Sequence, residues 1–155
     1  MAAVALVFVY GTLMRRHANH RVLVRLGARF ADRARTEAPR TLVDLGPYPA
    51  LLPVDARRDR TTVEGELFHV APAALPELDA FEGCPRLYRR TSVTVVTERG
   101  DRREAYTYEL ARRPPASARP VEGGRYEGGG RALETSAEEI DAAAGPVADP
   151  GDVTS

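Results

Sequence analysis

An apolar run near the start of the chain ends in a glycine-containing turn, and this pairing most constrains the fold. Residues Val4 to Val9 are uncharged and rich in β-branched and aromatic side chains, which predicts a short buried β-strand. Glycine has no Cβ, so Gly11 would allow a sharp turn with several backbone N–H groups aimed at an anion or oxyanion. An ordinary tight turn after a core strand is the simpler alternative. The turn consists of Tyr10, Gly11, Thr12 and Leu13.

The composition is that of one soluble domain, with 155 residues, 43% of them hydrophobic and 28% charged. The 22 basic and 22 acidic residues cancel, which disfavours nucleic acid as a partner. Every basic residue is an arginine, which excludes lysine Schiff-base chemistry and a P-loop lysine. The chain shows neither a signal-peptide pattern nor the ~20 apolar residues of a membrane helix. Cys84 is the only cysteine, so we expect a reducing, cytoplasmic location.

The hydrophobic patterns predict more strands than helices, without regular alternation, which indicates an α+β fold and disfavours a doubly wound sheet. Residues 28–36, 61–70, 87–97 and 104–110 are expected as strands, with a bulge or a close backbone approach at Gly65. Helices are expected over 19–26, capped by Asn19 and ended by Gly27, and over 72–81. We expect a main domain over 1–112, an extension over 113–132 that docks on it, and a disordered tail over 133–155.

A second segment, from Leu78 to Arg90, supplies a carboxylate at the end of the second expected helix. Glu82 closes that helix, and Gly83 allows the chain to turn away sharply behind it. A solvated glutamate at a helix C-terminus is the plain alternative, although its charge is unfavourable against the helix dipole there. Asp79 is the nearest rival carboxylate, and its simplest role is to cap or to form an ion pair.

Four segments, in this order, resemble the γ-glutamyl cyclotransferase-like family, and within it the γ-glutamylamine cyclotransferases. The resemblance implies a small mixed β-barrel with flanking helices and a cavity at one mouth. It also implies a cofactor-independent reaction in which the substrate's α-amine attacks its own γ-amide, releasing 5-oxoproline and an amine. The branch substrate it points to is γ-glutamyl-ε-lysine. The segments are Ala5–Leu13, Asn19–Leu23, Val63–Leu67 and Leu78–Arg90.

The resemblance also assigns roles to residues. Glu82 is expected to act as general base and then acid, while the turn's backbone N–H groups bind the substrate α-carboxylate and the oxyanion. Tyr88 is a further substrate-binding candidate, because a phenol combines an apolar ring with a polar tip. For Tyr106 and Tyr108, which alternate onto one side of a strand, packing on the sheet with the hydroxyl in solvent is the simpler alternative. The candidate pocket-wall residues are Tyr48, Tyr106, Tyr108 and Tyr126.

Other chemistries find little support in the sequence. The three histidines show no metal-ligand spacing, and no Gly-x-Ser-x-Gly motif is present, so neither a metal site nor a serine hydrolase is expected. Two alternatives remain open: removal of a γ-glutamyl protecting group from a natural-product intermediate, and a binding module of the same fold without catalysis. The expected partner is a small γ-glutamyl compound, with no cofactor, nucleic acid, membrane or obligate protein partner.

Overall fold

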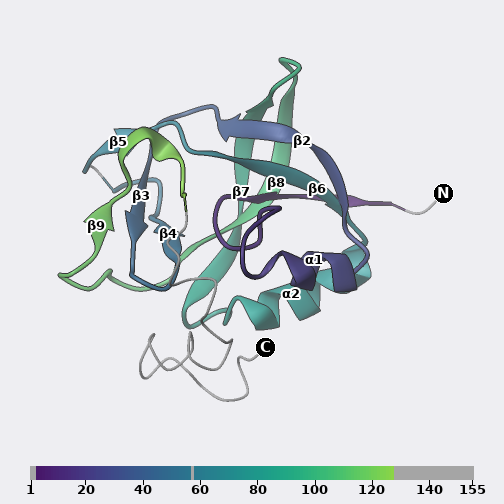
Figure 1. The fold of residues 1–155 in the computed structure, drawn as a ribbon, viewed down its shortest axis with the longest axis horizontal. Helices are drawn as coiled ribbons and strands as arrows, with labels where there is room; N and C mark the ends of the chain where they lie inside the picture. Colours follow the sequence, from purple (N-terminus) through teal and green to yellow (C-terminus); the bar gives the residue numbers. More distant parts are fainter. Residues whose placement is uncertain (1–2, 57, 128–155) are drawn as a thin grey trace.

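The computed structural model describes residues 3–56 and 58–127 of the chain. Its centre is a closed barrel in which five strands pair in the order β1, β6, β2, β7, β8, and β8 returns to β1 (Figure 1). The neighbours are antiparallel except β1 and β8, which pair in parallel. The expected α+β fold with a small mixed barrel is therefore confirmed. The strands are β1 (Ala5–Val9), β2 (Arg29–Thr36), β6 (Glu64–Val70), β7 (Tyr88–Thr97) and β8 (Arg102–Leu110).

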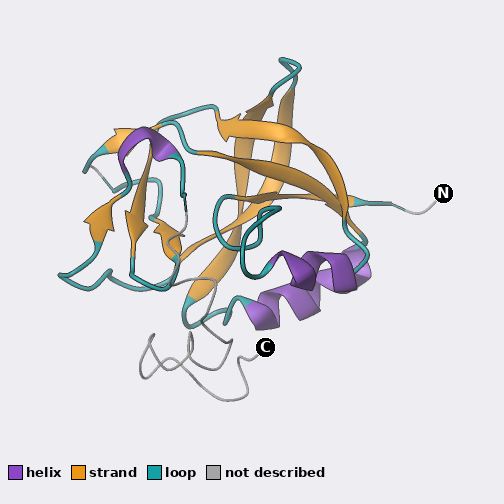
Figure 2. Cartoon of the chain, in the orientation of Figure 1, coloured by secondary structure: helices purple, strands orange, loops and turns teal. Residues whose placement is uncertain are grey.

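A small group of short strands extends the barrel sheet from β8 and lies beside the barrel (Figure 2). β4 (Pro49–Leu51) pairs with β8 in parallel, β3 (Arg40–Asp44) pairs with β4, and β5 (Arg60–Thr61) pairs with β3. Of the extension expected over 113–132, the structure describes residues up to 127. This part contains β9 (Arg119–Pro120), which pairs with β3, and a 3₁₀ turn η2 (Glu122–Gly124). The tail expected over 133–155 lies outside the described residues.

Two short helices lie on the same side of the barrel (Figure 1). The helix expected over 72–81 consists of a 3₁₀ turn η1 (Pro72–Ala74) that leads into α2 (Leu75–Phe81). The other helix, α1 (His20–Arg25), is followed by Gly27 at φ +76°, as expected for a helix stop. Asn19 occupies the N-cap position of α1 as expected, but its side chain makes no capping hydrogen bond and donates to Thr12 instead. No helix within the described ranges is long and apolar enough to cross a membrane.

Strand β1 is buried on both faces, which places the turn after it at the centre of the molecule. Val7 and Val9 face the core cluster that contains the helix residues, while Phe8 faces a second cluster inside the barrel. The neighbouring strand comes very close at Gly65, where a Cβ would collide with the Val9 carbonyl oxygen and lie 2.8 Å from the Phe8 ring. The close approach expected at Gly65 is thus confirmed. The absence of a side chain at Gly65 lets β6 pack closely against the end of β1, directly before the turn.

Candidate active site

A pocket of about 670 Å³, counted with its open mouth, lies where the turn after β1 meets the end of α2. Its wall is completed by the chain segment that enters β4, by the first residue of β7 and by the last part of β8. Most of the residues expected at a site are brought together here although they are far apart in sequence. These are Tyr10, Gly11, Thr12, Leu13, Tyr48, Glu82, Tyr88 and Tyr108.

Two expected wall residues, Tyr106 and Tyr126, are not among the residues that line this pocket. Tyr106 is 39% exposed on β8, and the Arg90 guanidinium lies 4.9 Å from its ring centre. Tyr126 is buried, and its ring packs on His17 with 5.7 Å between the ring centroids. The alternation of the strand could not separate Tyr106 from Tyr108, because the sequence does not show where the pocket ends along β8. For Tyr126, which follows η2, nothing in the sequence indicated the element it would pack against.

Glu82 is held at the end of α2 by a regular helix C-cap. Glu82 is the last residue of helical conformation, and Gly83 follows at φ +72°. The N–H of Gly83 donates to the carbonyl of Ala80 at 3.1 Å, and the N–H of Cys84 donates to the carbonyl of Asp79 at 3.0 Å. This is the Schellman pattern, in which a left-handed glycine ends the helix and satisfies its last carbonyls. The sharp departure expected at Gly83 is confirmed, and it fixes the Glu82 backbone at the pocket.

The surroundings of Glu82 favour its protonated form. Burial is the main cause, and the nearby Asp79 carboxylate is the second; together they raise the pKa of Glu82 to about 8. The residue keeps partial contact with solvent, but no hydrogen-bond partner for its carboxyl group is found within residues 3–56 and 58–127. A half-buried carboxyl with a pKa close to that of an amine can exchange protons with that amine at little energetic cost.

The turn after β1 offers backbone donors that no described residue uses. Met14 N–H donates to the Gly11 carbonyl at 3.0 Å, and Arg15 N–H donates to Glu66 Oε1 at 2.8 Å. In the part of the chain that the structure describes, the N–H groups of Gly11, Thr12 and Leu13 have no such acceptor. Three free backbone donors in one pocket can bind a carboxylate or a developing oxyanion. The substrate-binding role that the sequence resemblance gave to the turn stays a prediction.

The residues that begin α1 clamp this turn from outside. Asn19 is only 2% exposed, and its backbone N–H donates to the Thr12 carbonyl at 2.9 Å. Its side-chain Nδ2 donates to Thr12 Oγ1 at 3.0 Å, and Nδ1 of His20 lies 2.9 Å from the Leu13 carbonyl oxygen. These bonds hold the backbone that presents the free N–H groups. Sequence reasoning missed this role of Asn19, because a helix cap accounts equally well for an asparagine at that position.

Glycine at position 11 was expected for the sharp turn it would allow, but in the structure it is needed for close packing against Pro49. It is absent from the residues of positive φ, so its backbone conformation is open to other amino acids. A Cβ at this position would lie 2.7 Å from Cγ and 3.0 Å from Cδ of the Pro49 ring, which also lines the pocket. The absence of a side chain therefore lets the turn pack against Pro49, and a side chain there would press on β4 rather than directly on a ligand.

Two pocket tyrosines have hydroxyl groups of defined orientation. Tyr88 donates its hydroxyl proton to the Pro49 carbonyl at 2.7 Å, and Tyr108 donates to Asp79 Oδ1 at 2.7 Å. Burial, as the largest cause, raises the pKa of both phenols well above 10, so both keep their protons. Each hydroxyl oxygen therefore has lone pairs left for a ligand but no further proton to give. The alternative expectation, a Tyr108 hydroxyl group exposed to solvent, is wrong, because this hydroxyl is bonded to Asp79.

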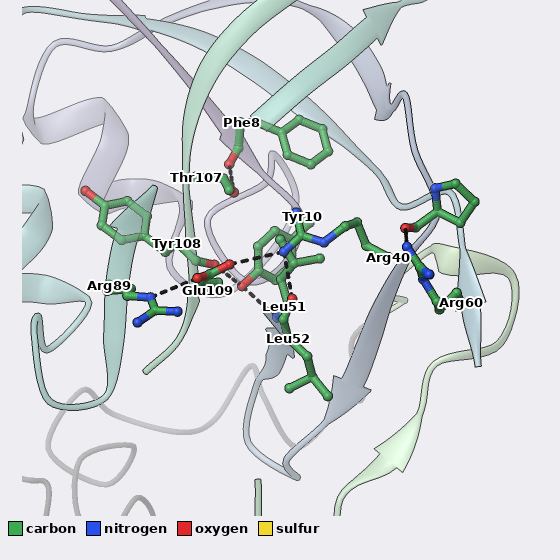
Figure 3. Close-up of polar contacts among 11 residues, drawn as sticks. Phe8, Tyr10, Arg40, Leu51, Leu52, Arg60, Arg89, Thr107, Tyr108 and Glu109 are labelled. Carbon is green, nitrogen blue, oxygen red and sulfur yellow. Dashed lines mark hydrogen bonds and ion pairs between the residues drawn. The ribbon is translucent and has the colours of Figure 1, made fainter. Parts of the chain in front are cut away.

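The hydroxyl of Tyr10 differs from those of Tyr88 and Tyr108, because it both donates and accepts a hydrogen bond within the protein. It donates to the Tyr108 carbonyl at 2.6 Å and accepts the Leu51 N–H at 3.0 Å (Figure 3). Burial is again the largest cause of its raised pKa, so the phenol remains neutral. The side chain of Tyr10 therefore ties β8 to β4, while its backbone begins the turn.

A buried ion pair underlies this part of the wall, and nothing in the sequence pointed to it. Arg40 and Glu109 are both buried, with Nη2 3.1 Å from Oε1, and Arg40 Nη2 also donates to the Leu52 carbonyl at 2.7 Å (Figure 3). The other Glu109 oxygen accepts from Arg89 Nε at 2.8 Å. One carboxylate thus joins the starts of β3 and β7 to the end of β8. Breaking such a buried pair on one side typically costs about 3–5 kcal/mol.

The described residues offer no ready place for a metal ion. Within residues 3–56 and 58–127, no group of three or more His, Cys, Asp or Glu side chains is arranged to hold one. The polar groups of the pocket include the Glu82 carboxyl group, the phenols, the backbone donors of the turn and the side chains of Thr12 and Asn19, which bond to each other. That set can bind a small zwitterion and move protons.

A closed barrel with a carboxyl group and turn amides in one pocket is the arrangement expected for the γ-glutamyl cyclotransferase-like family. The family model described as gamma-glutamyl cyclotransferase, AIG2-like, matches residues 7–128. The chain belongs to this family.

Named relatives agree with this assignment. Gamma-glutamylaminecyclotransferase from Homo sapiens is 46% identical over 98 residues, which cover 59% of this chain and 61% of the human protein. The Bos taurus protein of the same name is 42% identical over 116 residues, covering 70% of this chain and 67% of its own. The crystal structure of an AIG2-like protein from Mus musculus aligns with a TM-score of 0.64 and 34% identity, over 72% of this chain and 80% of the mouse chain. The chain thus spans about three fifths to two thirds of the length of the named human and bovine relatives.

Proposed function

We propose that the protein is a cofactor-independent γ-glutamylamine cyclotransferase with Glu82 as its proton-transfer group. The observation that carries the proposal is the pairing, in one pocket, of an unpartnered carboxyl group with three free backbone donors. The names of the human and bovine relatives support the same activity. The proposed substrate is a small γ-glutamyl amine, and the proposed location is the cytoplasm.

In the proposed complex, the turn binds the negative end of the substrate. The free N–H groups of Gly11, Thr12 and Leu13 would hold the α-carboxylate and, in the transition state, the oxyanion on the γ-carbonyl. Binding both ends folds the γ-glutamyl chain so that its α-nitrogen meets its γ-carbon. Well-oriented intramolecular reactions of this kind reach effective molarities of about 10⁵ M or more. Positioning therefore supplies much of the rate, and no covalent intermediate with the enzyme is needed.

Glu82 moves the protons in this scheme. As a carboxylate it takes one proton from the α-ammonium, and the neutral α-nitrogen attacks the γ-carbon to give a tetrahedral oxyanion. Glu82 then gives this proton to the leaving nitrogen as the old C–N bond breaks. The ring nitrogen gives up a second proton, which also ends on the departing amine. The products are 5-oxoproline and an alkylammonium ion, and Glu82 is again a carboxylate.

The raised pKa of Glu82 sets the expected pH dependence. In the empty pocket, a carboxyl with a pKa of about 8 is mostly protonated at neutral pH. A substrate that arrives as an ammonium ion needs the carboxylate form, so kcat/KM should rise with pH up to about 8. It should fall again at higher pH, where the free substrate loses its ammonium proton.

The test is turnover with a panel of γ-glutamyl compounds that includes γ-glutamyl-ε-lysine, with detection of both 5-oxoproline and the free amine. Glu82→Gln keeps the size of the side chain but cannot accept the proton, so its rate should fall by about 10²–10⁴-fold. Glu77→Gln, which removes an exposed carboxylate from the first turn of the same helix, is the matched control. Binding of the panel without any 5-oxoproline, or a Glu82→Gln variant with more than a tenth of the wild-type rate, would contradict the proposal.

A further inference from the structure

A second carboxylate stands beside the pocket with contacts of its own. Asp79 lies on α2, three residues before Glu82, and accepts the hydroxyl proton of Tyr108 at 2.7 Å. The Nε of Arg90 lies 3.6 Å from the same Asp79 oxygen, and the Arg90 guanidinium stacks 4.9 Å from the ring centre of Tyr106. Asp79 is thus fixed between a surface arginine and a phenol that lines the pocket.

The contact between Asp79 and Tyr108 decides which hydrogen bonds the phenol can make. A tyrosine hydroxyl has one proton and two lone pairs. Because the proton is directed to Asp79, the oxygen can only accept hydrogen bonds from a ligand. Tyr88 is in the same condition, since its proton goes to the Pro49 carbonyl. A pocket with two phenol oxygens that only accept, next to one carboxyl group, matches the three N–H bonds of a primary ammonium ion.

We propose that Asp79 is a positioning residue that turns the Tyr108 hydroxyl oxygen towards the substrate α-ammonium, beside Glu82. The inference rests on the proposed cyclotransferase function and adds to it the group that recognises the ammonium ion. Arg90 lies beside the same Asp79 oxygen that accepts the phenol proton, and a carboxylate is a strong hydrogen-bond acceptor. A neutral amide in place of Asp79 could instead donate to the phenol oxygen, and the phenol proton would then face the incoming cation.

The negative charge of Asp79 has a second effect, on Glu82 itself. It is the second cause, after burial, of the raised pKa of Glu82, so it favours the protonated form in the empty pocket. Removal of this charge should therefore lower the pKa of Glu82. Within the described residues, the titratable and charged groups near Glu82 include Asp79 from α2, Tyr10 from the turn after β1, Tyr48 before β4, Cys84 from the loop after α2, Tyr88 and Arg90 from β7, and Tyr108 from β8.

The experiment compares Asp79→Asn and Tyr108→Phe with the wild type and with Glu77→Gln as control. We expect both variants to raise KM for a γ-glutamyl amine by about tenfold, the loss that goes with a hydrogen bond to a charged group. The acid limb of the kcat/KM–pH profile should move to lower pH in Asp79→Asn and stay in place in Glu77→Gln. A role in folding alone would not move this limb.

A second readout does not depend on turnover. The ¹³C carboxyl signal of Glu82, followed by NMR in the ligand-free protein, should titrate at lower pH in Asp79→Asn than in the wild type. A wild type that releases 5-oxoproline while Tyr108→Phe keeps KM within twofold would overturn the assignment, as would an Asp79→Asn variant with unchanged KM and unchanged Glu82 titration. A wild type that releases no 5-oxoproline would instead refute the proposed function, and the role of Asp79 would then be judged by whether Asp79→Asn and Tyr108→Phe weaken binding of the γ-glutamyl panel by about tenfold.

Discussion

Replacement of Glu82 by glutamine is expected to stabilise the folded protein at neutral pH while it abolishes turnover. The reason is that folding raises the pKa of this carboxyl from an ordinary 4.5 to about 8. At pH values between 4.5 and about 8, Glu82 is deprotonated in the unfolded chain but stays protonated in the folded protein. The folded state then binds more protons than the unfolded state, so its stability falls as pH rises through this window.

The size of the effect follows from the same two values. Each pH unit in the window costs about 1.4 kcal/mol, so at pH 7 the wild type gives up about 3 kcal/mol relative to a side chain that does not titrate. Glutamine has nearly the same shape, and any hydrogen bond that its amide gains or misses contributes equally at every pH. The pH-dependent part of the difference between the two proteins therefore reports on the Glu82 proton alone.

The assay is equilibrium unfolding in urea of the wild type and Glu82→Gln at pH 5 and at pH 7. We expect the difference in unfolding free energy to shift in favour of the variant by about 2–3 kcal/mol between these pH values. For a chain of this length, a gain of that size corresponds to a rise in Tm of roughly 5–10 °C at pH 7. If the difference is the same at both pH values, the Glu82 carboxyl has an ordinary pKa, and the reasoning about its role in proton transfer loses its basis.

Further predictions concern the turn and the chain end. Gly11→Ala should reduce stability by about 1–3 kcal/mol, measured by thermal unfolding, and should reduce turnover as well, because the new methyl group would press on the Pro49 ring. Asn19→Ala should raise KM with a stability loss of about 1 kcal/mol, since the clamp on Thr12 is lost; an unchanged KM would show that the clamp is not needed. Removal of residues 133–155, which hold few large apolar side chains, should leave Tm and turnover nearly unchanged.

Local signals in the sequence were sufficient for the elements that carry the site. The uncharged run before Tyr10 predicted β1, and the apolar spacing from Leu75 to Phe81 with Gly83 behind it predicted the helix and its end. These features depend on neighbours within a few residues, and the structure contains both, with Leu75 and Leu78 of the helix buried. The position of Glu82 followed directly, because a left-handed glycine marks the residue before it as the helix end.

The remainder of the site depends on contacts between distant segments. Arg40 and Glu109 lie 69 residues apart, and one arginine and one glutamate among 22 basic and 22 acidic residues carry no signal of burial. Closure of the barrel likewise requires β1 to meet β8 in parallel, which no local period indicates. The packing reason for Gly11 could not be predicted either, because its neighbour Pro49 lies in a strand that is distant in the sequence.

The short strand β4 explains why these distant contacts matter for the pocket. Its Pro49 ring supports the turn at Gly11, its Pro49 carbonyl orients the hydroxyl of Tyr88, and its Leu51 N–H holds the hydroxyl of Tyr10. The turn and two of the pocket phenols therefore have contacts with this one strand, which is itself paired with β8. Without β4 the turn would keep its clamp from Asn19, and Tyr108 would keep Asp79, but Gly11 would lose its packing on Pro49 and the hydroxyls of Tyr88 and Tyr10 would each lose a partner. Substitutions in β4 that keep the fold should therefore lower activity more than stability.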